Sequence, residues 1–89
     1  MSERDRLVLD NLDWAERIAV NRTKGMPRFV RLDDLKSAAY LGLVEAATRF
    51  RSEKGVPFTA WAAPRVLGSI TDWLRELGRW KFESLSNAI

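Results

Sequence analysis

Residues 33–50 read DDLKSAAYLGLVEAATRF, residues 51–57 read RSEKGVP, and residues 58–79 read FTAWAAPRVLGSITDWLRELGR. In the first and third of these segments, apolar residues recur three and four positions apart, which is the pattern of an amphipathic helix. The middle segment contains Gly55 and Pro57, and residues of these types favour a turn. The stretch therefore predicts two helices joined by a short turn.

Capping signals predict where these helices begin and end. An acidic side chain at a helix start faces the positive end of the helix dipole, and proline is favoured in the first turn. The expected boundaries are Asp33 or Asp34 to Phe50 for the first helix, and Pro57 to Arg79 or Trp80 for the second.

A further helix is expected upstream of these two. Ser2 followed by Asp5 resembles a capping box, with Asp in place of Glu. The helix should end near Asn21, because the breakers Gly25 and Pro27 follow. No strand alternation or repeat is present, so the fold class predicted is all-α.

The predicted architecture is a compact bundle of three main helices over residues 1–80. A chain of 89 residues allows one small core, and a hydrophobic content of 46% is enough to form it. Residues 81–89 have only a weak periodic pattern. They are expected to form a short C-terminal extension with a frayed end.

The composition argues against an enzyme. The chain has no cysteine and no histidine, so it lacks a thiolate and the commonest general base and metal ligand. It also has no phosphate-binding glycine loop, and we expect no catalytic residue, metal or cofactor. No apolar run is long enough to span a bilayer, and the charged start MSERDRL is unlike a signal peptide. We therefore expect a cytoplasmic protein without a membrane partner.

The net charge of +3 is unevenly distributed along the chain. Residues 22–31 contain four basic residues and no acid, and residues 49–65 contain four basic residues against Glu53 alone. A basic strip beside aromatic residues is typical of nucleic-acid binding. The alternative is an ordinary mixed-charge surface in contact with solvent.

The helix predicted over residues 33–50 has apolar residues on two sides. One side is the natural core face, made of Leu35, Ala39, Gly42, Leu43, Ala46 and Phe50. Gly42 costs about 1 kcal/mol against Ala in a helix interior, which indicates close backbone packing. The opposite side carries Ser37, Tyr40, Leu41, Val44 and Thr48. Either this helix is central and buries both sides, or the second side is a docking stripe for a partner helix.

The helix predicted over residues 58–79 also has two distinct sides. Its expected core face is Ala63, Val66, Leu67, Ile70, Leu74 and Leu77, and the other side carries Phe58, Trp61, Arg65, Gly68, Asp72 and Arg79. We expect Trp61 to point away from the core, where it could stack on an unpaired base next to Arg65. The alternative, a local aromatic cluster under the preceding loop, is the expected role of Phe58 but not of Trp61.

These features together resemble conserved region two of bacterial RNA polymerase sigma factors, especially alternative ones of the flagellar, sporulation and general-stress kind. The resemblance covers nearly all of the chain up to Trp80. Each matching motif alone is common, but the order and spacing of the motifs together are fairly specific. It is carried by Asp34-Leu35, Gly42-Leu43, Arg49-Phe50, Lys54-Gly55-Val56-Pro57-Phe58, Ala62-Ala63-Pro64, Gly68 and Leu74-Arg75.

The resemblance implies two partners. In that family, one helix docks on the clamp helices of the polymerase β′ subunit, and the matching positions are Asp34, Ser37, Ala38, Tyr40, Leu41 and Val44. The next helix opens promoter DNA at the −10 element and captures an unstacked base of the nontemplate strand. Its matching residues are Phe58, Trp61 and Arg65, with Arg49, Arg51 and Lys54 placed for phosphates.

The chain also departs from the family pattern. Ser37-Ala38 stand where a Gln-Glu pair is common, and Pro64-Arg65 stand where primary sigma factors have two tryptophans. Gly68 replaces a polar reader of the −10 duplex. No domain for the −35 element is present, so the chain is either a fragment or a free-standing protein with a partner that supplies this recognition. The alternative function is a protein-interaction module that binds polymerase, a sigma partner or an anti-sigma factor without reading DNA.

Overall fold

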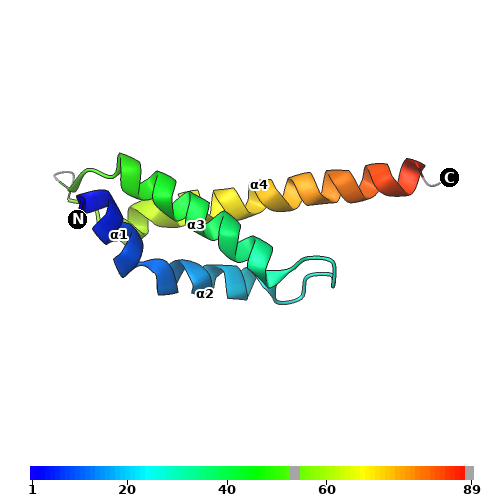
Figure 1. Cartoon of the computed structure of the whole chain (residues 1–89), viewed down its shortest axis with the longest axis horizontal. Coiled ribbons are helices and arrows are strands. Elements are labelled where there is room, and N and C mark those ends of the chain that lie inside the picture. Colours follow the sequence, from blue (N-terminus) through cyan, green and yellow to red (C-terminus); the bar gives the residue numbers. More distant parts are fainter. Residues whose placement is uncertain (53–54, 88–89) are drawn as a thin grey trace.

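The computed structural model describes residues 1–52 and 55–87, and within them the side chains of residues 1–52 and 55–82. The described chain is all-α, as predicted (Figure 1). Over this part, no helix is both long and apolar enough to cross a membrane. The helices are α1 (Glu3–Asp10), α2 (Leu12–Thr23), α3 (Leu32–Arg49) and α4 (Phe58–Asn87).

The single helix expected near the N-terminus is in fact two helices, α1 and α2, separated at Asn11. The side-chain amide of Asn11 donates a hydrogen bond of 2.8 Å to the carbonyl of Leu7. Its backbone N–H bonds the carbonyl of Val8 instead of continuing the helical pattern. Asparagine competes in this way for the backbone, so it ends α1 although the apolar pattern continues. The cap at Ser2 is confirmed, because its hydroxyl accepts the N–H of Asp5 at 3.1 Å.

The helix α3 begins slightly earlier than expected and ends where expected. Its N-cap is Arg31, and neither Asp33 nor Asp34 caps it, because both lie inside the first turn. They still place negative charge at the positive end of the dipole. Phe50 is the C-cap, in agreement with the expected end.

The helix α4 is longer than expected. It begins at Phe58, directly after Pro57, but it continues past Trp80 and ends at Asn87. The frayed extension expected for residues 81–89 is therefore wrong for 81–87, and residues 88 and 89 lie outside the described part. The weak apolar pattern there does not prevent the helix, because no Pro or Gly interrupts residues 79–87.

The helix α3 is central, with α1 and α2 on one side and α4 on the other (Figure 1). The core face predicted for α3 is confirmed, since Leu35, Ala39 and Leu43 are fully buried. On α4 the prediction holds for Val66 and Ile70 but is wrong for Leu67, which is 40% exposed. The fully buried core residues are Ala15, Ala19, Leu35, Ala39, Leu43, Ala46, Ala62, Val66 and Ile70.

The backbones of α3 and α4 touch at Gly42, as its position in the sequence indicated. A Cβ atom added to Gly42 would lie 2.8 Å from both the carbonyl oxygen of Arg65 and the Cα of Val66. One turn away, the Ser69 hydroxyl donates a 2.7 Å hydrogen bond to the carbonyl of Ala38. The crossing of the two helices is therefore fixed by contact of main chain with main chain.

The contact between α2 and α3 is fixed by a polar pair. The Tyr40 hydroxyl donates a hydrogen bond to the carboxylate of Glu16. This hydrogen bond, together with burial and the charges of Glu16 and Asp13, raises the pKa of Tyr40 from 10.0 to about 12. Tyr40 therefore faces α2, and it does not face outward as the docking-stripe interpretation requires.

Replacement of Gly42 by Ala should destabilise the fold. The new methyl group must push the two helices apart, which costs more than the roughly 1 kcal/mol that Ala gains in helix propensity. We expect a net loss of about 1–2 kcal/mol in the free energy of unfolding, measured by urea denaturation. Gly78→Ala is the matched control: Gly78 is likewise inside a helix, α4, but a Cβ there meets nothing within 4 Å. This control should be neutral or stabilising, and equal effects of the two variants would contradict the account.

Tyr40 should titrate at unusually high pH. The folded chain keeps the phenol proton to a higher pH than the unfolded chain does, so this pair stabilises the fold below pH 10 and progressively less from pH 10.0 to 12. Tyr40 is the only tyrosine, so its ionisation can be followed by ultraviolet absorbance. Glu16→Gln should lower its pKa. Titration of the wild-type residue at its ordinary value would show that the pair does not form.

Candidate nucleic-acid and protein interface

An aromatic cluster lies where the chain turns from α3 into α4. The rings of Phe50 and Phe58 meet edge to face, with centroids 5.2 Å apart. The ring of Trp61 lies 6.3 Å from that of Phe50. The predicted role of Phe58 in a local cluster is therefore confirmed.

Trp61 is half-buried in the same cluster, so the expectation that it points freely away from the core is wrong. Its indole N–H donates a 3.0 Å hydrogen bond to the carbonyl of Ala46, in the last turn of α3, where carbonyls lack helical partners. The guanidinium of Arg65 lies 3.5 Å from the centre of the indole ring and donates to the Trp61 carbonyl. Helical spacing predicted the Trp61–Arg65 pair, but it could not show that α3 ends within reach of the indole.

A pocket of about 370 Å³ opens beside this cluster. Its lining combines two cationic side chains with two aromatic rings and one aliphatic side chain: Arg49, Arg51, Phe50, Trp61 and Val56. The volume lies within the range of ordinary small-ligand sites, roughly 300–1,000 Å³. Three of the residues proposed from sequence for DNA, Arg49, Arg51 and Trp61, therefore line a common pocket.

The other residues proposed for DNA lie outside this lining. The Phe58 ring packs against the Phe50 ring, and the Arg65 guanidinium lies over the Trp61 ring. Lys54 lies outside the described residues. Val56 is 44% exposed and lines the pocket, but sequence reasoning missed this role because Val56 belongs to the turn and has no helical spacing.

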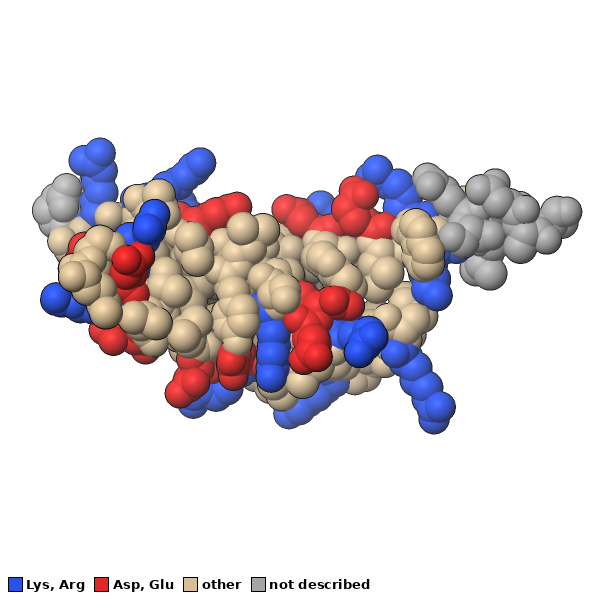
Figure 2. All heavy atoms as spheres, viewed as in Figure 1, with Lys and Arg blue, Asp and Glu red and all other residues tan. Residues whose placement is uncertain are grey.

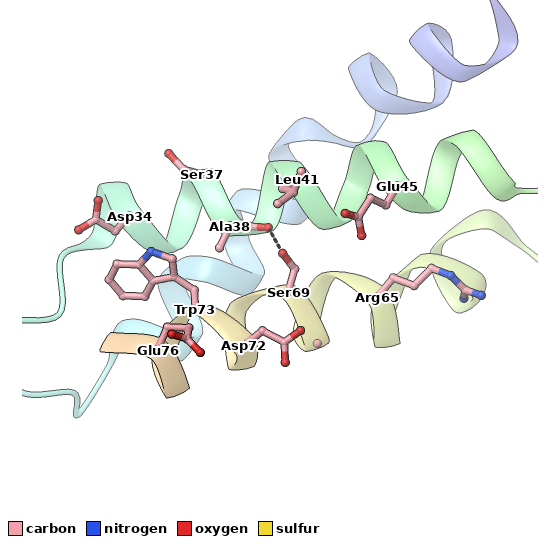
Figure 3. Close-up of a pocket in the computed structure, with 11 residues that line it drawn as sticks. Asp34, Ser37, Ala38, Leu41, Glu45, Arg65, Ser69, Asp72, Trp73 and Glu76 are labelled. Carbon is pink, nitrogen blue, oxygen red and sulfur yellow. Dashed lines mark hydrogen bonds between the residues drawn. The ribbon is translucent and has the colours of Figure 1, made fainter. Parts of the chain in front are cut away.

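A second depression, of about 600 Å³, lies between α3 and α4 (Figure 3). Its lining includes the small residues Ala38, Gly68 and Ser69, and the Ser69 hydroxyl bonds the Ala38 carbonyl across the two helices. Leu41 and Trp73 provide apolar walls. Four carboxylates surround it, from Asp34 and Glu45 on α3 and from Asp72 and Glu76 on α4, with Arg65 at one end. We refer to this depression as the acidic groove.

The six residues proposed for polymerase binding do not all lie on one surface. Asp34, Ser37, Ala38 and Leu41 line the acidic groove, where Leu41 is 57% exposed and Ala38 is buried. Val44 is exposed but lies beside Val8 and Leu9 of α1. Tyr40 faces α2. The six residues therefore do not form one exposed stripe, because α3 is central and buries part of both sides.

Sequence reasoning missed the wall that α4 contributes to the groove. Asp72, Trp73 and Glu76 lie opposite Asp34 and Leu41, and the sequence analysis assigned none of them to an interface. Their spacing of three and four was visible in the sequence. The crossing angle of the helices, which brings them opposite α3, was not.

Comparison with known proteins gives the chain a family. The family model for sigma-70 region 2 matches residues 7–80. RNA polymerase sigma factor FliA of Pseudomonas aeruginosa is 30% identical over 79 residues, which cover 89% of this chain and 32% of that protein. FliA of Escherichia coli is 40% identical over 50 residues, covering 56% of this chain and 21% of the relative. The RNA polymerase sigma-D factor of Bacillus subtilis is 38% identical over 52 residues, covering 58% and 20%.

The chain thus spans less than a third of the length of each of these relatives. No solved structure matches it. The match of the family model covers α3, the turn after it and α4 as far as Trp80, and this part contains the residues that line the pocket and the acidic groove. The resemblance seen in the sequence is therefore confirmed, and the chain belongs to the sigma-70 region 2 family.

Proposed function

We propose that the chain is a transcription initiation module that docks on the β′ clamp helices of RNA polymerase and binds and opens −10 promoter DNA. The observation that supports this most strongly is the pocket at the start of α4. It combines Arg49 and Arg51 with the rings of Phe50 and Trp61. Cations for phosphate and rings for bases are the two groups that single-stranded nucleic acid requires.

In this proposal, the pocket receives a base of the nontemplate strand after the base has left the DNA stack. Removing a base from a duplex costs a few kcal/mol, and stacking on an aromatic ring returns about 1–3 kcal/mol. Binding of this kind can therefore support strand opening without ATP. Arg49, Arg51 and Lys54 would hold the adjoining phosphates.

The contacts of Trp61 limit how a base can stack. Its N–H is used by Ala46, so the indole does not donate to the base. Arg65 lies over the ring, and a base must therefore use the face that lines the pocket. Phe58 acts indirectly, because its contact with Phe50 supports the pocket wall. We assign Phe58 and Arg65 to positioning Trp61 and Phe50.

The acidic groove suits a protein partner better than DNA. Asp72 and Glu76 pair with Arg75 and Arg79 at the surface. Together with Asp34 and Glu45 they still make the lining acidic, which favours a helix that carries basic side chains over a phosphate backbone. Exposed Leu41 beside Trp73 provides the apolar contact that helix-in-groove recognition uses. We therefore propose that the polymerase β′ subunit binds at this groove, through Asp34, Ser37 and Leu41.

A second candidate function is a protein-interaction module that binds polymerase, a sigma partner or an anti-sigma factor without DNA. The acids on α4 favour it, because Asp72 and Glu76 lie along the helix that would follow the DNA. The two functions differ in one respect. Only the first requires the pocket at Arg49 and Trp61.

Trp61→Ala and Arg49→Ala test the DNA contact. Loss of one stacking ring should weaken binding of a −10 single strand to the polymerase complex by roughly five- to a hundred-fold. Loss of the exposed Arg49 should make DNA binding less dependent on salt, by the amount expected for about one lost phosphate contact. Trp61→Phe is the control, because it keeps a ring and removes only the N–H bond to Ala46. If polymerase binding persists in all three variants and DNA binding is unchanged, the pocket is not the DNA contact; if the wild-type complex binds polymerase but no DNA, the second candidate function is favoured.

Leu41→Glu tests the acidic groove. It replaces the apolar contact of Leu41 by a side chain that must be desolvated in the interface, which should weaken polymerase binding by about tenfold or more. The fold should keep its stability, because Leu41 is 57% exposed. Leu67→Glu is the matched control, since Leu67 is also an exposed helical leucine and does not line the groove. Binding can be measured by co-migration with core polymerase. Equal losses in both variants, or none in either, would exclude the groove as the docking site.

A further inference from the structure

The chain that leads from the end of α2 into α3 is basic, and the proposed function does not use it. Residues 22–31 carry four cations and no acid: Arg22, Lys24, Arg28 and Arg31. None of the four forms an ion pair with a described side chain. Phe29 lies among them and is 44% exposed. We call residues 22–31 the basic segment.

The fold holds the basic segment in one place. Val30 is buried in the core, and Met26 packs against the core as well. The Lys81 ammonium lies 4.9 Å from the centre of the Phe29 ring, which is within the range of cation–π attraction. The segment is thus fixed to the core and to α4. A surface that is already ordered loses little entropy when it binds a partner.

The basic segment borders the acidic groove. It leads directly into α3, and Asp34, which lines the groove, comes soon after Arg31. On α4, Glu76 of the groove precedes Lys81, the residue that touches Phe29, by about 7.5 Å along the helix axis. Figure 2 shows basic side chains next to acidic ones where the segment lies in Figure 1. The molecule therefore carries two adjoining surfaces of opposite charge.

The two surfaces are complementary in chemistry. The groove, of about 600 Å³, combines four carboxylates with apolar walls at Leu41 and Trp73. The basic segment combines four cations with the exposed ring of Phe29. Within one molecule, the burial of Val30 and the contact with Lys81 hold the segment outside its own groove. The groove of a second copy of the chain is not restricted in this way.

We propose that two copies of the chain form a dimer in which the basic segment of each copy lies against the acidic groove of the other. Because the two surfaces adjoin, a twofold axis between them makes both contacts at once, as an isologous interface requires. Phe29 of one copy contacts Leu41 and Trp73 of the other, and the cations face the carboxylates. Charge pairing of this kind favours register and association rate more than affinity. The dimer is therefore weak and sensitive to salt.

The dimer and the complex with polymerase exclude each other, because both cover the acidic groove. This consequence rests on the proposed function, which places the β′ subunit at that groove, whereas the dimer itself does not. Polymerase that binds the monomer draws the equilibrium away from the dimer by mass action. Free chains thus keep the apolar walls at Leu41 and Trp73 covered until polymerase takes the place of the second copy.

Sedimentation equilibrium of the 89-residue chain tests the dimer. The average mass should rise from one chain toward two with concentration at about 0.05 M salt, and remain that of one chain at about 0.5 M, where charges are strongly screened. Arg28→Glu and Asp72→Arg should each weaken the dimer by about tenfold or more. An equimolar mixture of the two variants should restore it, because opposite charges then meet again across both contacts. Asp72 suits this exchange, since its pair with Arg75 at 4.0 Å is exposed and contributes little to stability.

Two further variants separate the contact from general effects. Arg17→Glu makes the same charge change as Arg28→Glu at an exposed position of α2, and it should leave the dimer unchanged. Phe29→Ala should weaken the dimer and leave polymerase binding intact, because Phe29 does not line the groove. Circular dichroism of each variant shows whether the fold is kept.

The outcomes distinguish this proposal from the proposed function. A chain that stays monomeric at low salt overturns the dimer, even if it docks on polymerase. A dimer that the mixture of Arg28→Glu and Asp72→Arg does not restore, or a species that grows beyond two chains, overturns the twofold arrangement. If the dimer forms with the expected responses but core polymerase does not dissociate it, the dimer stands and docking of polymerase at the groove fails.

Discussion

The contact between Gly42 and the backbone of α4 is the constraint on which the rest of the structure depends. With no side chain on Gly42, the Arg65 carbonyl and the Val66 Cα approach to a distance that a Cβ could not tolerate. The crossing of α3 and α4 leaves the acidic groove to one side of this point, and it brings the first turns of α4 against the last turn of α3. Both candidate interfaces therefore follow from one close approach of two helices.

The pocket illustrates how helix-end chemistry can build a binding site. The last carbonyls of α3 need donors, and the indole of Trp61 supplies one to Ala46. That bond fixes a large ring at the mouth of the pocket, Arg65 holds its other side, and Arg49 and Arg51 complete the lining. A ring that is already fixed loses little entropy when a base stacks on it. The half-burial of Trp61, which the sequence did not predict, would therefore suit the proposed base capture better than a freely exposed ring.

Most of the fold could be predicted from the sequence, because it depends on local signals. The Ser2 cap, the buried face of α3, the turn at Pro57 and the reason for Gly42 could all be read from spacing and residue type. The errors have physical causes. Asn11 broke a helix through a side-chain bond to the backbone that apolar periodicity does not reveal. Tyr40 was predicted to face outward, but Glu16, 24 residues away, binds its hydroxyl. Pairings between distant elements, such as Trp61 with Ala46 or Ser69 with Ala38, depend on the crossing of helices and not on the pattern within one helix.

The central claim is that one small helical domain holds polymerase and a DNA strand at the same time on separate surfaces. The most direct test mixes the purified chain with bacterial core RNA polymerase and a −10 single strand and follows all three components by co-migration. The account predicts a ternary complex in which the chain is needed to retain the DNA, with Leu41→Glu releasing the chain and Trp61→Ala releasing only the DNA. A chain that does not co-migrate with polymerase, with or without DNA, would contradict the account.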